Sequence, residues 1–252
     1  MNRKLHHALP ATEHGSRCAL AFLICLIALS PPTIAQQRID MALVLAVDTS
    51  RSVDNKEFSL QMAGLAAAFR DPSVQYAITT AAPQGLAITM VQWSAMNEQE
   101  QVIPWTLLTQ LEDIDRLADT ISATPRAMKG NKTALGEAMA FSIDLLDRLH
   151  YNPRRRVIDI SGDGGSNEGR LPQEVREQAR EAGIIINGVA ILNEEPRLNH
   201  YFRTDVIVGT GAFILTATDY VDFARAIRMK LIREILGTPI AALETEEDHS
   251  IE

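Results

Sequence analysis

The sequence predicts an α/β fold in which helices flank a doubly wound, mostly parallel sheet. Short apolar runs rich in β-branched residues alternate with longer segments whose apolar residues recur every three or four positions. The short runs show no apolar–polar alternation, which is typical of strands buried on both faces of a parallel sheet. Strands and helices that alternate in this order predict parallel neighbours joined by right-handed crossovers.

The expected elements follow one another without a linker or an internal repeat. The buried strands, apolar along their length, are residues 41–47, 86–93, 156–161 and 184–192. A short edge strand is expected at residues 101–107, because Pro104 lacks the N–H that a central strand needs. The last strand, or pair of strands, is expected at residues 206–208 or 213–216. The helices, each with one apolar face, are residues 55–70, 111–122, 133–149, 172–182 and 219–236.

Length and charge limit the class of protein. A chain of 252 residues holds one sizeable domain, which we assign to residues 38–240. The formal net charge of −8 disfavours nonspecific binding to nucleic acid or to an anionic membrane. Residues 241–252 are acidic and polar, and we expect them to form a flexible tail.

Residues 1–35 have the composition of a secretory signal peptide. Basic residues precede an apolar run at residues 18–29, and the small residues Thr33 and Ala35 stand at positions −3 and −1 of a cut before Gln36. The apolar run is shorter than the roughly 20 residues that a spanning helix needs. We therefore expect an exported protein, periplasmic or secreted. The alternative is an uncleaved leader that anchors the chain in the membrane.

Cysteine and histidine offer little chemistry beyond the leader. Both cysteines, Cys18 and Cys25, lie within it, so the mature chain would have no disulfide, no thiolate zinc site and no cysteine nucleophile. The histidines that follow the leader, His150, His200 and His249, are far apart in the sequence and lack ligand spacing. A histidine metal site is therefore not expected.

Oxygen donors gather in three segments that are expected at one edge of the sheet. Asp48, Ser50 and Ser52 directly follow the first buried strand, Thr133 stands at the entrance to a helix, and Asp163 follows a later strand. In open α/β sheets, ligands bind at the carboxyl edge, where the strands end. Carboxylate and hydroxyl oxygens suit a small divalent cation completed by water, rather than zinc.

The three segments resemble the motif of a known family. Asp48-Thr-Ser50-Arg-Ser52, Thr133 in a Gly-x-x-Thr-x-x-Gly setting, and Gly-Asp163-Gly are similar to the metal-ion-dependent adhesion site (MIDAS) of the von Willebrand factor A (VWA) domain. The resemblance covers nearly all of the chain beyond the leader and implies a Rossmann-like VWA fold. It is strongest to a group of exported bacterial proteins that carry this domain.

The resemblance implies a role for each of the five residues. Ser50 and Ser52 would bind the cation through their hydroxyls, and Thr133 would bind it when the site is liganded. Asp48 and Asp163 would hold coordinated waters or, in some states, the cation itself. We expect Mg²⁺ as the cofactor, with Mn²⁺ or Ca²⁺ as alternatives. The remaining position would be left for an Asp or Glu of a partner protein.

The chain departs from the family pattern just before the threonine. Asn131 and Lys132 occupy the two positions that are usually glycine. Thr133 and Gly136 are present, so we expect coordination to persist. Lys132 would place a positive charge beside the path of an acidic partner.

Three hypotheses for function remain. The first is a non-enzymatic, exported module that binds an acidic residue of another protein through a divalent cation. The second is a metal-dependent hydrolase that uses the same cation to polarise a substrate or to activate water. The third is a structural scaffold whose site stays empty in use. A carboxylate near the site other than Asp48 and Asp163 would favour the hydrolase.

Overall fold

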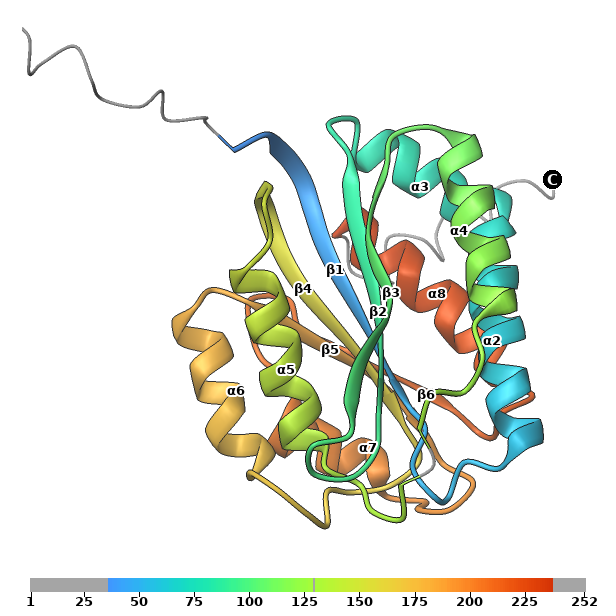
Figure 1. Ribbon diagram of the computed structural model, residues 1–252, viewed down its shortest axis with the longest axis vertical. Helices are drawn as coiled ribbons and strands as arrows, with labels where there is room; N and C mark the ends of the chain where they lie inside the picture. Colours follow the sequence, from blue (N-terminus) through green and yellow to red (C-terminus); the bar gives the residue numbers. More distant parts are fainter. Residues whose placement is uncertain (1–35, 129, 238–252) are drawn as a thin grey trace, which may run out of the picture. The chain divides into compact units, whose positions relative to one another are not determined.

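The computed structural model describes residues 36–128 and 130–237. The predicted leader, residues 1–35, and the predicted tail, residues 241–252, lie outside these ranges, as do residues 238–240 of the predicted domain. The α/β fold is confirmed, since helices cover both faces of a mostly parallel sheet (Figure 1). No helix of the described ranges is long and apolar enough to cross a bilayer.

In the part of the chain that the structure describes, the sheet contains six strands in the order β3-β2-β1-β4-β5-β6. All neighbouring strands are parallel except β2 and β3, which form an antiparallel pair at one edge. The strand order changes direction between β1 and β4, which is the topological switch point of the sheet. The strands are β1 (Arg38–Asp48), β2 (Leu86–Trp93), β3 (Gln99–Leu108), β4 (Asn152–Gly162), β5 (Ile185–Ile191) and β6 (Ile214–Ala217).

The helices divide between the two faces of the sheet (Figure 1). One face is covered by α2 (Asn55–Arg70), α3 (Pro72–Ala81), α4 (Leu111–Ala123) and α8 (Phe223–Leu236). The other face is covered by α5 (Leu135–Asp147), α6 (Pro172–Glu181), and the short α7 (Leu198–Tyr201) with the π-helix η2 (Phe202–Val206).

Strand β1 is buried on both sides, as its apolar sequence predicts. Met41, Leu43 and Leu45 pack with the α2 and α8 side, whereas Ala42 and Val44 pack with the α5 side. Successive side chains of a strand point to opposite faces, so an uninterrupted apolar run fills both cores at once. The strand therefore delivers its last residue, Asp48, into the interior at the switch point.

Two helices begin later than predicted. α5 begins at Leu135, so Thr133 lies in the loop before the helix and not within it. α8 begins at Phe223, because Asp219 accepts hydrogen bonds from the backbone N–H groups of residues 221 and 222 and closes a turn. Both differences place side chains of interest in loops at the carboxyl edge of the sheet.

Strand boundaries differ where pairing extends beyond the apolar run. β4 begins at Asn152, four residues before the predicted start, because Asn152 pairs with Arg38 of β1. The last strand, β6, matches the second predicted range closely, and Val208 of the first range forms a single antiparallel bridge with Ile186. α2 and β2 have the predicted bounds.

α3, α7 and η2 have no counterpart among the predicted elements. Pro72 ends α2, but it also occupies the first turn of α3, where the missing N–H costs nothing. Asp71 accepts a hydrogen bond from the Ser73 N–H at 2.8 Å and so caps the start of α3. Pro72 therefore separates the two helices and also begins the second one.

Candidate metal centre

The loops after β1 and β4 leave the sheet side by side. β1 and β4 are parallel neighbours, and Val47 is in register with Ser161. The next residues of each chain, Asp48 and the pair Gly162–Asp163, therefore emerge together at the carboxyl edge. Asp48 and Asp163 are both fully buried.

A chain of hydrogen bonds joins four of the five predicted site residues. Asp48 Oδ1 accepts from the Ser50 N–H at 2.7 Å, and the hydroxyls of Ser50 and Ser52 are 3.2 Å apart. Ser52 Oγ then donates to Asp163 Oδ1 at 2.7 Å. The structure thus brings both carboxylates and both serine hydroxyls of the prediction into one continuous cluster.

The cluster places two buried carboxyl groups close together. Burial raises the pKa of the Asp48 carboxyl to about 7, and the charge of Asp163 adds to this effect. Asp48 Oδ2 is buried and has no hydrogen-bond partner. A buried oxygen of this kind is costly unless a donor or a cation satisfies it. The carboxyl edge therefore holds an acceptor that the described protein atoms leave unpaired.

Gly162 keeps the space around this oxygen open. A Cβ atom at position 162 would lie 3.1 Å from Asp48 Oδ2 and 3.6 Å from the Trp93 ring. At position 164, on the other side of Asp163, an added Cβ would meet no atom within 4 Å. A side chain at position 162 would therefore crowd the Asp48 carboxyl, whereas one at position 164 would not.

The donor set fits a hard divalent cation. Ser52 uses its proton toward Asp163, so its oxygen lone pairs remain able to bind a cation. Within residues 36–128 and 130–237, no three His, Cys, Asp or Glu side chains gather in a group that could hold a metal ion. Hydroxyls would therefore have to supply the remaining ligands, which Mg²⁺ or Ca²⁺ tolerates better than zinc does.

Thr133 is held next to the cluster by its backbone. The Thr133 N–H donates to Asn167 Oδ1 at 3.0 Å, and the Asn167 N–H donates back to the Thr133 carbonyl at 2.9 Å. The following N–H, of Ala134, donates to the Ser94 carbonyl beyond β2 at 2.7 Å. The loop is thus fixed between the ends of β2 and β4, and Lys132 beside it is exposed.

The hydroxyl of Thr133 is not part of the hydrogen-bonded cluster. Among the hydrogen bonds of the described residues, none joins this hydroxyl to Asp48, Ser50, Ser52 or Asp163. The predicted role of Thr133 as a ligand of the occupied site stays a prediction, as does the cation binding of the other four. Its buried position at the same edge is compatible with that role.

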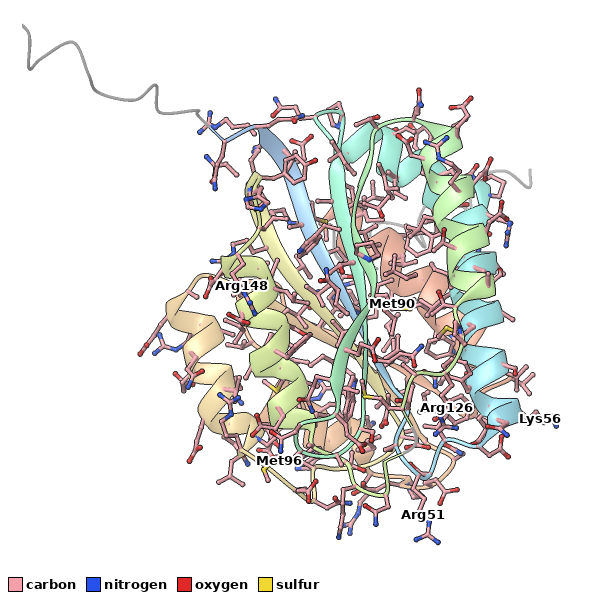
Figure 2. All side chains as sticks on the ribbon, in the orientation of Figure 1. Arg51, Lys56, Met90, Met96, Arg126 and Arg148 are labelled. Carbon is pink, nitrogen blue, oxygen red and sulfur yellow. The ribbon has the colours of Figure 1, made fainter. Side chains whose placement is uncertain are left out.

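Arg126 supports the loop that follows β1, although it belongs to no sequence motif that predicts this contact. Its guanidinium donates to the carbonyls of Val53 at 2.7 Å, Thr49 at 2.7 Å and Ser50 at 3.0 Å. Its Nε donates to the Met128 carbonyl at 2.9 Å. Figure 2 shows Arg126 at the same end of the molecule as Arg51, which is exposed. Arg126 fixes the loop, and its charge lowers the pKa of Asp48, against the stronger effect of burial.

Tyr220 also reaches the cluster and is invisible to sequence patterns. It lies in the turn between β6 and α8 and is buried. Its hydroxyl donates to Asp163 Oδ2 at 3.0 Å. Burial and the charge of Asp163 raise the pKa of Tyr220 far above its ordinary value, so the hydroxyl stays protonated and acts as a donor. A separation of 57 residues hides this contact from any local pattern.

Glu57 is a further carboxylate, and the charge of Asp163 affects its pKa. Its pKa is raised by burial and by the charges of Asp54, Asp163 and Glu194, although the Asp54 N–H acts in the opposite direction. Both of its oxygens are engaged: Oε2 accepts from the Asp54 N–H at 2.7 Å, and Oε1 accepts from Asn193 at 3.1 Å. Glu57 therefore serves as a cap at the start of α2.

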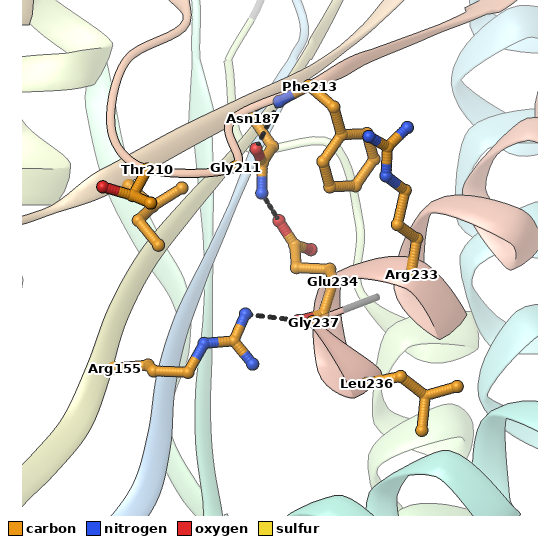
Figure 3. A pocket seen from close by; sticks show the side chains of 10 residues that line it. Arg155, Asn187, Thr210, Gly211, Phe213, Arg233, Glu234, Leu236 and Gly237 are labelled. Atoms are coloured by element: carbon orange, nitrogen blue, oxygen red, sulfur yellow. Dashed lines mark hydrogen bonds between the residues drawn. The ribbon is translucent and has the colours of Figure 1, made fainter. Parts of the chain in front are cut away.

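A second group of buried charges lies at the opposite edge of the sheet. Lys230 of α8 is 2.7 Å from Asp159 and 3.2 Å from Glu234, and all three are buried. Asn187 donates to Glu234 at 2.6 Å beside a cavity of about 340 Å³ that Arg155 also lines (Figure 3). This group attaches α8 to β4 and β5, and it contains none of the predicted site residues.

Solved structures with this fold are VWA domains. The chain is similar to proximal thread matrix protein 1 of the mussel byssus with a zinc-occupied MIDAS motif, at 15% identity and a TM-score of 0.52, over 78% of this chain and 46% of that one. It is similar to a von Willebrand factor type A protein of Catenulispora acidiphila at 14% identity and a TM-score of 0.57, over 79% and 43%. It is similar to the pilus adhesin SpaC of Lactobacillus rhamnosus GG, in its open conformation, at 12% identity and a TM-score of 0.55, over 78% and 30%.

The fold and the arrangement of the three loops define the protein as a VWA-type domain, and this confirms the resemblance drawn from the sequence. Residues 38–239 match the model of a family described as protein of unknown function (DUF1194), and the chain belongs to this family. No curated protein matches the chain. The chain spans less than half the length of each solved structure named above, and at these identities the likeness shows the fold alone.

Proposed function

We propose that the protein is an exported, non-enzymatic module that binds an acidic residue of a partner protein through a divalent cation. Mg²⁺ is the expected cation. Its proposed ligands, direct or through water, are Asp48, Ser50, Ser52, Thr133 and Asp163.

The proposal rests on one observation: a continuous chain of hydrogen bonds joins Asp48 Oδ1 to Asp163 Oδ1, and the other oxygen of Asp48, Oδ2, is buried without a partner among the described protein atoms. A set of buried oxygens that repel one another is costly in the folded protein. Such a cost is offset when a cation binds among them. Without a ligand, the same side chains would destabilise the fold, and no binding function would offset this cost.

The neutral hydroxyls determine what the site would attract. A bound divalent cation supplies a positive centre that a carboxylate can coordinate. Ser50, Ser52 and Thr133 add no negative charge to the site, so only the carboxyl groups of Asp48 and Asp163 oppose the charge of the cation. Arg51 and Lys132 are exposed and adjacent in the sequence to these ligands, and their charges favour the approach of an acidic group.

The hydrolase hypothesis gains no support from the described residues. Glu57, a carboxylate electrostatically linked to Asp163, has both oxygens engaged in other bonds. The similar proteins include a pilus adhesin and a thread matrix protein, whose names describe adhesion and structural roles. Binding rather than turnover is therefore proposed for this chain.

Export is part of the proposal and rests on the leader of residues 1–35. A signal peptide would deliver the domain to the periplasm or beyond the cell. There it would meet partners that are themselves exported or exposed at the surface. If the leader were retained, the domain would present the same site from the membrane.

The proposal is tested by capture of exported proteins on the immobilised protein in Mg²⁺ and in EDTA. A partner that binds in Mg²⁺, is lost in EDTA, and is not retained by Ser52→Ala supports it. Ser59→Ala, an exposed serine of α2 that bonds only to its own helix, is the matched control. A partner retained equally in Mg²⁺ and in EDTA would show that binding does not run through the cation.

A further inference from the structure

Asp163 accepts a hydrogen bond on each of its two carboxylate oxygens. Ser52 donates to Oδ1 at 2.7 Å, and Tyr220 donates to Oδ2 at 3.0 Å. The first donor is a proposed cation ligand, whereas the second lies outside the five residues of the motif. The Tyr220 contact is shielded from water, because Asp163 is fully buried and Tyr220 is nearly so, whereas Ser52 is exposed.

The turn that carries Tyr220 is well fixed. Asp219 accepts from the N–H groups of Val221 at 2.8 Å and Asp222 at 2.9 Å, and Asp222 accepts from the Thr218 N–H at 3.0 Å. Asp222 also forms an ion pair with Arg225 in the first turn of α8. The phenol hydroxyl is therefore presented to Asp163 from a preformed turn and not from a mobile side chain.

The two donors together determine the orientation of the carboxylate. With Oδ2 held by Tyr220, Oδ1 faces Ser52 and accepts the proton of that hydroxyl. The lone pairs of the Ser52 oxygen are then directed away from Asp163 and are available to a cation. If Oδ2 lost its donor, the carboxylate could rotate, and the Ser52 hydroxyl would lose its fixed direction.

We propose that Tyr220 is a positioning residue of the metal centre, which holds Asp163 so that Ser52 presents its lone pairs to the cation. This inference rests on the proposed function, because it requires that a cation binds. It adds the β6–α8 turn to the loops that build the site. It also gives Asp163 the task of orienting the Ser52 hydroxyl, in addition to its proposed contact with the cation.

The test is a calorimetric titration of the full chain with Mn²⁺, comparing wild type, Tyr220→Phe and Tyr201→Phe. Tyr201 is the matched control: it is partly buried near the same loops, and its hydroxyl accepts from the Ser166 N–H at 3.3 Å without touching Asp163. Both phenylalanine variants keep the ring and therefore the packing, and circular dichroism in EDTA checks that each variant is folded.

Tyr220→Phe is expected to raise the Mn²⁺ dissociation constant about tenfold, the size expected for one lost hydrogen bond to a charged group. Tyr201→Phe is expected to stay within about twofold of wild type. In an Asp163→Ala background, Tyr220→Phe should add no further loss, because the residue acts through that carboxylate. A merely structural role would lower the unfolding temperature in EDTA and leave the dissociation constant unchanged.

Three results would overturn the inference and leave the proposed function intact. The first two are normal Mn²⁺ binding by folded Tyr220→Phe and an equal loss of Mn²⁺ affinity in the two tyrosine variants. A full additional loss in the Asp163→Ala background would also contradict it. Failure of the wild-type protein to bind Mn²⁺ would instead refute the proposed function, and the inference with it. The wild-type titration therefore separates the two failures.

Discussion

The unpaired oxygen of Asp48 makes stability depend on pH in a direction opposite to that of most surface carboxyl groups. Burial and the neighbouring Asp163 raise the pKa of Asp48 from 3.8 to about 7 in the folded protein. Between these values the folded state binds more protons than the unfolded state. In the absence of a cation, the free energy of unfolding must therefore fall as the pH rises through this window.

The size of the effect follows from the shift. One pKa unit corresponds to about 1.36 kcal/mol, and the interval from about pH 4.5 to about pH 7.5 covers most of the shift. We expect Asp48 to contribute a loss of about 3 kcal/mol over this interval. Asp48→Asn removes the titrating group and keeps an acceptor for the Ser50 N–H, so this loss should be absent from the variant.

The assay is urea unfolding in EDTA, followed by the fluorescence of Trp93 and Trp105. Asp159, whose pKa is also raised by burial, is present in both proteins, so its contribution cancels in the difference between wild type and Asp48→Asn. Saturating Mg²⁺ should remove the wild-type slope, because the cation competes with the proton. Parallel pH profiles for the two proteins in EDTA would refute the reasoning.

Two further changes test the packing around the site and the attachment of α8. Gly162→Ala should weaken Mn²⁺ binding about fivefold, because the new Cβ crowds Asp48 Oδ2 at 3.1 Å. Gly164→Ala should have no measurable effect. Calorimetric titration compares the two variants, and equal Mn²⁺ affinities would contradict the close approach. Lys230→Met should lower the free energy of unfolding by about 3–5 kcal/mol, since the carboxylates of Asp159 and Glu234 would be left buried without the ammonium group. Urea unfolding measures this loss. A loss below about 1 kcal/mol would show that the ion pairs of Lys230 are not needed for stability.

The architecture could be predicted because the sequence pattern of its main elements agrees with their burial in the fold. The run that ends at Val47 is apolar on both faces, and the structure buries both faces. An N-terminal cap, Asp54, directly precedes the 16 residues of α2, which carry an apolar face, and the helix has the predicted bounds. The bounds of an element could not be predicted where pairing with a distant strand determines them. Asn152, for example, is a strand residue only because β1 lies beside it.

The site was predictable to the extent that its residues belong to short motifs. Asp48, Ser50 and Ser52 form a local pattern, and Asp163 follows a buried strand in a recognisable way. Arg126 and Tyr220 have no such context. They reach the cluster through folds of the chain that join residues 57 to 77 positions apart, so their roles exist only in three dimensions.

The central claim is that hydroxyls after β1 bind a divalent cation together with two buried carboxylates. It is tested most directly by calorimetric titration of the protein with Mg²⁺ and Mn²⁺, comparing wild type with Asp48→Ala and with Ser52→Ala. We expect a single saturable site in the wild-type protein and a loss of binding by at least about tenfold in each variant. Absence of binding heat in the wild-type protein, or unchanged binding in both variants, would contradict it.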